Sequence, residues 1–128
     1  MSPLFLRLND LLEIHRDQIE RYGGSLGVRD MGLLESALAM PQDGFGGQYF
    51  HGDLFEMAAA YLFHIVRNHP FVDGNKRAGA MAAYAFLRLN EIAFDAPGSD
   101  FERVVLSVAE GKFQKPAVAD FFRRRSRA

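Results

Sequence analysis

The sequence predicts an all-α protein, a compact single domain of about six helices that spans residues 1–128. Apolar residues recur three and four positions apart through most of the chain, whereas the alternation typical of strands is nearly absent. Capping and breaking residues divide this pattern into separate helical segments. With 128 residues, 48% of them hydrophobic, the chain has the size of one ordinary domain and can bury a core.

Three helices are expected before residue 69. The first should be capped by Asn9 and stopped at Gly23, and the second should be capped by Asp30 and ended by Pro41. The third should run from Leu54 to Asn68. The third helix should end near His69, because Pro70 disfavours the α region for the residue before it. Between the second and third helices, the segment 42–53 is rich in glycine and aromatic residues, which predicts a loop or a short irregular hairpin.

Three more helices are expected after the loop. Residues 75–90 are apolar almost all round, so this helix should be central and buried. Ser99 and Glu102 have capping-box spacing and should open a helix that Gly111 closes. Pro116 fits the first turn of a last helix, which ends in a run of arginines at 123–125.

The composition excludes several function classes. The chain has no cysteine, which excludes disulfides, zinc–thiolate sites and cysteine nucleophiles and suits a reducing compartment. Its 15 basic and 16 acidic residues give a net charge of -1, so direct nucleic-acid binding is not expected. The first residues lack the pattern of a signal peptide, and no apolar run is long enough for a membrane. We therefore expect a cytoplasmic protein without a membrane association.

The segment 69–77, His-Pro-Phe-Val-Asp-Gly-Asn-Lys-Arg, lies between the two central helices and carries the candidate chemistry. His69 ends one helix, where the dipole favours a protonated imidazole, and histidine is the commonest general base. Phe71 offers an apolar anchor for the loop. Gly74 lets a ligand approach the backbone, and the helix that follows presents free N–H groups to anions.

Lys76 and Arg77 are two cations in the first turn of a helix, where each costs roughly 0.3–1 kcal/mol if exposed. A bound polyphosphate would reverse that cost, and Asp73 beside it suits Mg²⁺. The loop thus holds a base, a metal ligand and a phosphate cradle, which phosphoryl transfer needs. The alternative for each residue singly is structural: Asp73 as a cap, His69 as a buried polar group, and the two cations as a solvated corner. Because all of these residues occur together between two central helices, a functional site is favoured over these structural roles.

These residues resemble the signature of the Fic/Doc family, and most closely its Doc branch, the death-on-curing toxins of bacterial toxin–antitoxin modules. Segments 20–24, 53–56, 86–90 and 109–112 are also similar to Doc, so the resemblance covers nearly the whole chain. It implies a Fic/Doc-like helical bundle with a short irregular or β-hairpin flap at 43–53, which aligns the target peptide by strand-like pairing. It also implies a set of roles: His69 as the base, Asp73 as the metal ligand, and Gly74, Asn75, Lys76, Arg77 and Arg67 as phosphate ligands.

Two positions bear on the reaction. AMP-transferring Fic enzymes usually have glycine at position 76 and arginine at position 80, whereas this chain has Lys76 and Ala80, as Doc-type enzymes do. The resemblance therefore implies an ATP- and Mg²⁺-dependent kinase that phosphorylates a threonine of elongation factor Tu, or another translation-related protein, and arrests translation. Gly74 follows the Fic pattern and keeps protein adenylyltransferase as the alternative. A non-catalytic binding module is the second alternative.

Regulation is expected from a second protein. The family's self-inhibiting signature is not matched, because the segment 107–111 is one residue too short. The resemblance therefore implies a Phd-type antitoxin that binds in a groove beside the active site. The other histidines, His51 and His64, lack zinc spacing relative to His69, and His64 is expected to be a core or groove residue.

Overall fold

A computed structural model describes residues 2–127 and forms six α-helices there. The helices are α1 (Leu8–Tyr22), α2 (Met31–Ala39), α3 (Leu54–Asn68), α4 (Asn75–Leu89), α5 (Gly98–Ala109) and α6 (Lys115–Arg124), with a 3₁₀ turn, η1, at Met40–Gln42. Four strands of two residues each are β1 (Gly44–Phe45), β2 (Gln48–Tyr49), β3 (Ala93–Phe94) and β4 (Ser126–Arg127). The predicted all-α fold with a short hairpin is confirmed.

The strands form two antiparallel pairs, β1 with β2 and β3 with β4. The first pair is the hairpin expected between the second and third helices. The second pair was not predicted, because two residues on each strand leave no periodic signal in the sequence. It joins the end of the chain to the segment that follows α4, since Ala93 pairs with Arg127 and Phe94 with Ser126.

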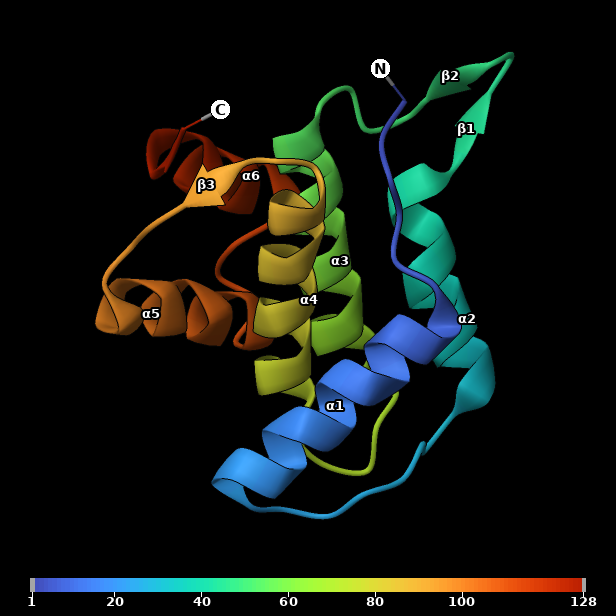
Figure 1. Cartoon of the computed structure of the whole chain (residues 1–128), viewed down its shortest axis with the longest axis vertical. Coiled ribbons are helices and arrows are strands. Elements are labelled where there is room, and N and C mark those ends of the chain that lie inside the picture. The colour runs from blue at the N-terminus through green and yellow to red at the C-terminus, as the bar shows by residue number, and fades with distance from the viewer. Residues whose placement is uncertain (1, 128) are drawn as a thin grey trace.

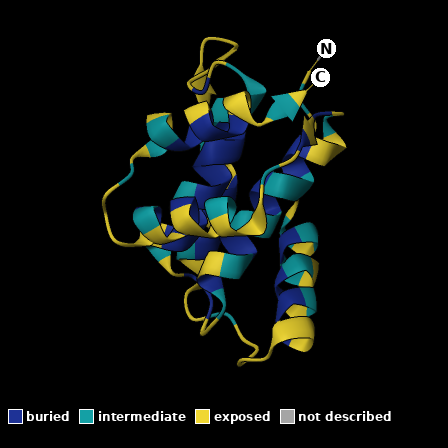
Figure 2. Ribbon diagram, turned by 90° about the vertical axis from the view of Figure 1, so that its left-hand side faces the viewer, coloured by how far each residue is buried: buried dark blue, intermediate teal, exposed yellow. Residues whose placement is uncertain are grey.

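Helices α3 and α4 run antiparallel through the centre of the molecule, and the other helices pack around them (Figure 1). The prediction that 75–90 forms a central, buried helix is confirmed by Ala78, Ala82 and Phe86, which are fully buried. Gly79 allows the two helices to approach closely, because a Cβ there would lie 2.8 Å from Val66 Cγ2. Buried residues accordingly gather along these helices, while the outer helices expose one side (Figure 2).

Most predicted helix boundaries are confirmed by their caps. The side chain of Asp30 accepts a hydrogen bond from the Leu33 N–H at 3.0 Å, and that of Asp53 accepts one from the Glu56 N–H at 2.8 Å. Pro116 lies in the first turn of α6, as expected. The two aspartates accept hydrogen bonds from N–H groups that have no partner inside the helix, and proline has no backbone N–H that could be left unpaired.

Two predicted helix starts are wrong. Asn9 is not a cap, because α1 begins one residue earlier and the Asp10 carboxylate accepts the Arg7 N–H at 2.8 Å. The capping box at Ser99 does not form, because α5 begins at Gly98, directly after Pro97. Within residues 2–127, no helix combines the length and the apolar character that a membrane crossing requires.

Candidate active site

The loop that joins α3 to α4 begins at His69. Its backbone lies in the left-handed region, with φ 54° and ψ 53°, and its N–H donates to the Ile65 carbonyl at 3.2 Å, which ends α3 as predicted. Histidine enters this region more readily than bulky or β-branched residues. The change of backbone direction leaves the His69 side chain exposed.

Phe71 anchors the loop to the core, as the sequence predicted, and is fully buried. Its ring stacks on the imidazole of His15 from α1, with centroids 3.8 Å apart and an angle of 3° between the planes. His15 Nε2 donates a hydrogen bond of 2.7 Å to the Asp73 carbonyl, which assigns the proton to Nε2. His15 therefore holds the loop in place through its contacts with the Phe71 ring and the Asp73 carbonyl. Its only sequence signal was a polar ring on the apolar side of a helix.

Asn75 closes the loop on itself. Its side chain is buried, with Oδ1 accepting from the Phe71 N–H at 2.9 Å and Nδ2 donating to the Phe71 carbonyl at 3.0 Å. The side-chain amide is thus engaged within the protein. What Asn75 can offer an anion is its backbone N–H in the first turn of α4.

The carboxylate of Asp73 is held by two backbone donors. Oδ2 accepts from the Ser25 N–H at 3.1 Å, and Oδ1 accepts from the Gly74 N–H at 2.8 Å. These hydrogen bonds, the one from Ser25 first, lower the pKa of Asp73 below its ordinary value, and the charge of Arg77 lowers it further. The group is therefore ionised at neutral pH. Each oxygen also keeps a lone pair for a further partner.

The two arginines predicted to bind phosphate both contact neighbouring helix ends. Arg77 donates to the Gln18 carbonyl at 3.2 Å and to the Gly23 carbonyl at 3.0 Å, at the end of α1. Arg67 donates to the Val108 carbonyl at 3.3 Å, near the end of α5. A guanidinium has five donors, so both side chains keep others. Their role as phosphate ligands stays a prediction.

Lys76 is the other cation of the loop. Its side chain is exposed, and no ion pair or hydrogen bond is formed by its ammonium within residues 2–127. Gly74, with φ 75°, precedes it as the N-cap residue of α4. The first N–H groups of a helix have no partner inside that helix, so the ammonium and the backbone together can receive an anion.

One cavity of about 320 Å³ brings most of the predicted residues together. It is lined by His69, Asp73, Gly74, Asn75, Lys76 and Arg77. Val66 of α3 and Ala109 at the end of α5 complete the wall, whereas Arg67 does not line it. We call this space the phosphate cavity, after the ligand that the sequence predicts for it. It combines a histidine, a carboxylate, an ammonium and a helix N-terminus.

The segment beside the loop is 23–30 and not the predicted flap. The Val72 N–H donates to the Gly27 carbonyl at 3.0 Å, and Val28 forms an antiparallel bridge with Phe71. The Arg29 guanidinium donates to the His69 carbonyl at 2.7 Å. Strand-like backbone pairing with the loop is therefore made by the segment that connects α1 to α2.

The hairpin expected at 43–53 is present, but it does not lie beside His69. The β1–β2 hairpin precedes α3, whereas His69 follows it, and the two lie at opposite ends of this helix (Figure 1). A helix of 15 residues is about 22 Å long, which is too far for the hairpin to position a group at the histidine.

His64 belongs to a separate cluster, away from the phosphate cavity. The Lys115 ammonium donates to Nε2 of His51 at 3.2 Å and to Nε2 of His64 at 3.1 Å. Burial and then the charge of Lys115 lower the pKa of His64 to about 4. The described residues contain no group of three His, Cys, Asp or Glu arranged for a metal ion.

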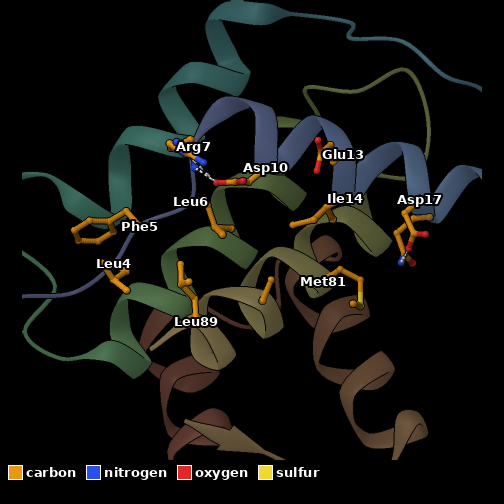
Figure 3. A pocket seen from close by; sticks show the side chains of 12 residues that line it. Leu4, Phe5, Leu6, Arg7, Asp10, Glu13, Ile14, Asp17, Met81 and Leu89 are labelled. Atoms are coloured by element: carbon orange, nitrogen blue, oxygen red, sulfur yellow. Dashed lines mark hydrogen bonds and ion pairs between the residues drawn. The ribbon is translucent and has the colours of Figure 1, made fainter. Parts of the chain in front are cut away.

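A groove with a volume of about 640 Å³ runs between α1 and α4 (Figure 3). Its apolar lining includes Ile14, Met81 and Leu89. Three acidic residues of α1, Asp10, Glu13 and Asp17, also line it, together with Arg7. Arg7 pairs with Asp10 at 3.6 Å, and Asp17 pairs with Arg21 at 2.8 Å, so the charge of the lining is partly compensated. Gln18 extends the lining toward Arg77, because its carbonyl accepts from that guanidinium. The groove therefore combines an apolar floor with negative charge close to the phosphate cavity.

The fold and the site define a class: a helical domain in which a histidine loop joins two central helices beside the N-terminus of the second of them. The sequence model of the Fic/DOC family matches residues 5–87, and the chain belongs to this family. It is 45% identical over 75 residues to Toxin Doc of Mycolicibacterium smegmatis, an alignment that covers 59% of this chain and 58% of that protein. It is 35% identical over 116 residues to Protein kinase doc of Escherichia phage P1, covering 90% of each. These relatives place the chain in the Doc branch, as the resemblance implied.

Proposed function

We propose that this protein is a Doc-type toxin that transfers the terminal phosphate of ATP to a serine or threonine hydroxyl of a protein. The observation that carries the proposal is the phosphate cavity, in which His69, Asp73 and Lys76 meet the N-terminus of α4. The name of the phage relative, Protein kinase doc, supports the same reaction.

The residues of the cavity suit such a transfer. His69 accepts the proton of the acceptor hydroxyl, and the hydroxyl oxygen forms a bond to the γ-phosphorus. The bond from that phosphorus to the β–γ bridging oxygen breaks, and ADP leaves. The Lys76 ammonium and the N–H groups of α4 stabilise the negative charge of the phosphates, which is the main demand of phosphoryl transfer.

Asp73 fits Mg²⁺ by the chemistry of its donors. Its carboxylate is ionised and keeps lone pairs, and Mg²⁺ favours one or two carboxylates together with phosphate oxygens. The ion would neutralise phosphate charge. The chain's own contribution is to hold the Asp73 carboxylate in place through the Ser25 and Gly74 N–H groups.

The biological target and partner follow from the same proposal. We place the acceptor on a threonine of elongation factor Tu, or another translation-related protein, so that modification arrests translation in the cytoplasm. A Phd-type antitoxin would control the enzyme. The groove between α1 and α4 fits an amphipathic helix with basic flanks, because its floor is apolar and Asp10, Glu13 and Asp17 line it.

Transfer of label from ATP tests the proposal. With a cell extract and Mg²⁺, γ-labelled ATP should label one dominant protein, and α-labelled ATP should label none. His69→Ala should lower the rate by at least about 100-fold, which is the usual contribution of a general base. His64→Gln is the matched control and should leave the rate unchanged, because His64 lies outside the phosphate cavity.

Other outcomes identify the alternatives. Label arriving only from α-labelled ATP would establish an adenylyltransferase, a reading that Gly74 favours, since glycine at this position follows the Fic pattern. If His69→Ala stays as toxic as the wild type on expression and neither label is transferred, the protein acts as a binding module.

A further inference from the structure

His15 of α1 makes two contacts that fix the direction of its imidazole. The residue is only 4% exposed, and its ring lies flat against the ring of Phe71. Because the two centroids are 3.8 Å apart and the planes almost parallel, the imidazole has little freedom to tilt. Its Nε2 therefore keeps one direction, toward the Asp73 carbonyl 2.7 Å away. A buried side chain of α1 thus fixes one backbone oxygen of the loop.

The Asp73 carbonyl belongs to a peptide group that also contacts the Asp73 carboxylate. A peptide group is planar, and in its trans form the C=O and the N–H point in opposite directions. The N–H of this group is that of Gly74, and it donates to Asp73 Oδ1 at 2.8 Å. The hydrogen bond from His15 to one side of the plane therefore determines where the donor on the other side points.

This peptide plane needs an external anchor because a glycine follows it. Gly74 has φ 75°, and glycine adopts positive and negative φ about equally well, so its own backbone does not fix the plane. A rotation of the plane would separate the Asp73 carbonyl from His15 and carry the Gly74 N–H away from the carboxylate. Helix α1 packs closely here, since a Cβ on Gly74 would lie 3.6 Å from His15 Nε2 and 3.0 Å from Ile19 Cδ1.

We infer that His15 is a positioning residue, which acts through the 73–74 peptide group to orient the Asp73 carboxylate for Mg²⁺; this inference rests on the proposed function. Two backbone groups hold the carboxylate, the Ser25 N–H and the Gly74 N–H. Loss of the His15 donor removes the constraint on the second of them. Partners that orient a metal ligand in this indirect way typically account for about 10–100-fold in metal affinity or activity.

Substitutions that separate the ring from the donor test the inference. His15→Phe keeps a stacked ring and removes the donor, so the Mg²⁺ concentration for half-maximal phosphate transfer should rise by at least about tenfold. His15→Gln offers an amide donor at a similar reach and should recover most of this loss. His64→Phe, the same change outside the phosphate cavity, is the control and should leave the Mg²⁺ requirement unchanged. A His15→Phe variant with the Mg²⁺ requirement of the wild type would overturn the inference.

Amide hydrogen exchange gives a readout that does not depend on activity. Exchange at Gly74 should accelerate by about tenfold or more in His15→Phe, because its hydrogen bond to the carboxylate is no longer held in place. Exchange at Phe71 should stay within about twofold of the wild type, because its N–H donates to Asn75 Oδ1 and not to a group that His15 contacts. Equal acceleration at both positions would show a general loosening of the loop and overturn the inference.

The unchanged protein gives a third test that no folding defect can affect. The imidazole ¹⁵N resonances of His15 should report a proton on Nε2, and a proton on Nδ1 alone would overturn the inference, because it leaves no donor for the Asp73 carbonyl. If the wild type transfers no γ-label while Gly74 and Phe71 respond to His15→Phe as expected, the positioning of Asp73 stands and the proposed kinase fails. Transfer of γ-label with an unchanged Mg²⁺ requirement in His15→Phe would reject the role of His15 alone.

Discussion

Gly24 lies against the carboxylate of Asp73 with no room for a side chain. Its φ is +117°, and a Cβ there would lie 2.6 Å from Asp73 Oδ2. Gly24→Ala therefore combines left-handed strain with displacement of the carboxylate, and should lower the free energy of unfolding by about 2–4 kcal/mol. Urea unfolding measures this loss, and the rate of phosphate transfer should fall in parallel.

Gly23→Ala is the neighbouring control. Gly23 also has a positive φ, +87°, but nothing lies within 4 Å of its Cβ position. The substitution should cause only backbone strain, about 1–3 kcal/mol, and leave the transfer rate near that of the wild type. Equal losses of activity in the two variants would show that contact with Asp73 is not the reason for glycine at position 24.

Single residues of the site were predictable where a local rule applied. His69 stands out because it lies at the predicted end of a helix. Lys76 stands out because its charge opposes the dipole at the start of the next helix. Arg77 shows the opposite case, because its guanidinium contacts the Gln18 carbonyl, 59 positions away in the sequence. His15, whose ring lies under Phe71, was missed for the same reason. Spacing along the chain does not reveal such partners.

At the scale of elements, the cluster of His51, His64 and Lys115 joins α6 to α3 and to the segment before α3. Burial first and then the positive charge of Lys115 lower the pKa of both histidines, that of His64 to about 4. Glu56 and Asp43 also face His51 and act in the opposite direction. The folded protein therefore favours neutral imidazoles here.

This cluster predicts a loss of stability in mild acid. In the unfolded chain His64 binds a proton below its ordinary pKa of 6.5, whereas in the folded protein it stays neutral down to about 4. Stability is therefore full above pH 6.5 and decreases as the pH falls toward 4. Because the side chain is only half-buried, we expect His64 to account for about 1–2 kcal/mol of that decrease.

His64→Gln isolates this contribution. Glutamine keeps an acceptor for the Lys115 ammonium but does not titrate, so the variant should lose about 1–2 kcal/mol less than the wild type between pH 7 and 4.5. Urea unfolding across this range measures the difference. Parallel pH profiles for the two proteins would show that His64 does not titrate with unfolding.

The elements themselves were largely predictable, because caps and breakers are local. Asp30, Leu54 and Pro116 each mark a helix start in the structure as in the sequence. The separation of 43–53 from His69 could also have been derived from the sequence. A helix of 15 residues separates that segment from His69, so the distance of about 22 Å followed from the predicted helix alone.

For the whole molecule, the question is whether the last two helices form part of one cooperative unit. The family match ends at residue 87, before α5 and α6 begin. The packing nevertheless joins them to the rest, because Phe122 of α6 and Val108 of α5 are fully buried in the same core cluster as Phe86 of α4. We therefore expect residues 1–128 to unfold in one transition, as single domains of this size usually do.

Phe122→Ala tests this unity from the end of the chain. Removing this buried ring should lower the free energy of unfolding by about 3–5 kcal/mol. If the protein is one unit, the folded-state amide resonances of α1 and α6 should disappear at the same urea concentration. In the variant, both should disappear together at a lower urea concentration than in the wild type. Loss of the α6 signals before those of α1, in wild type or variant, would instead show that the segment beyond the family match unfolds independently.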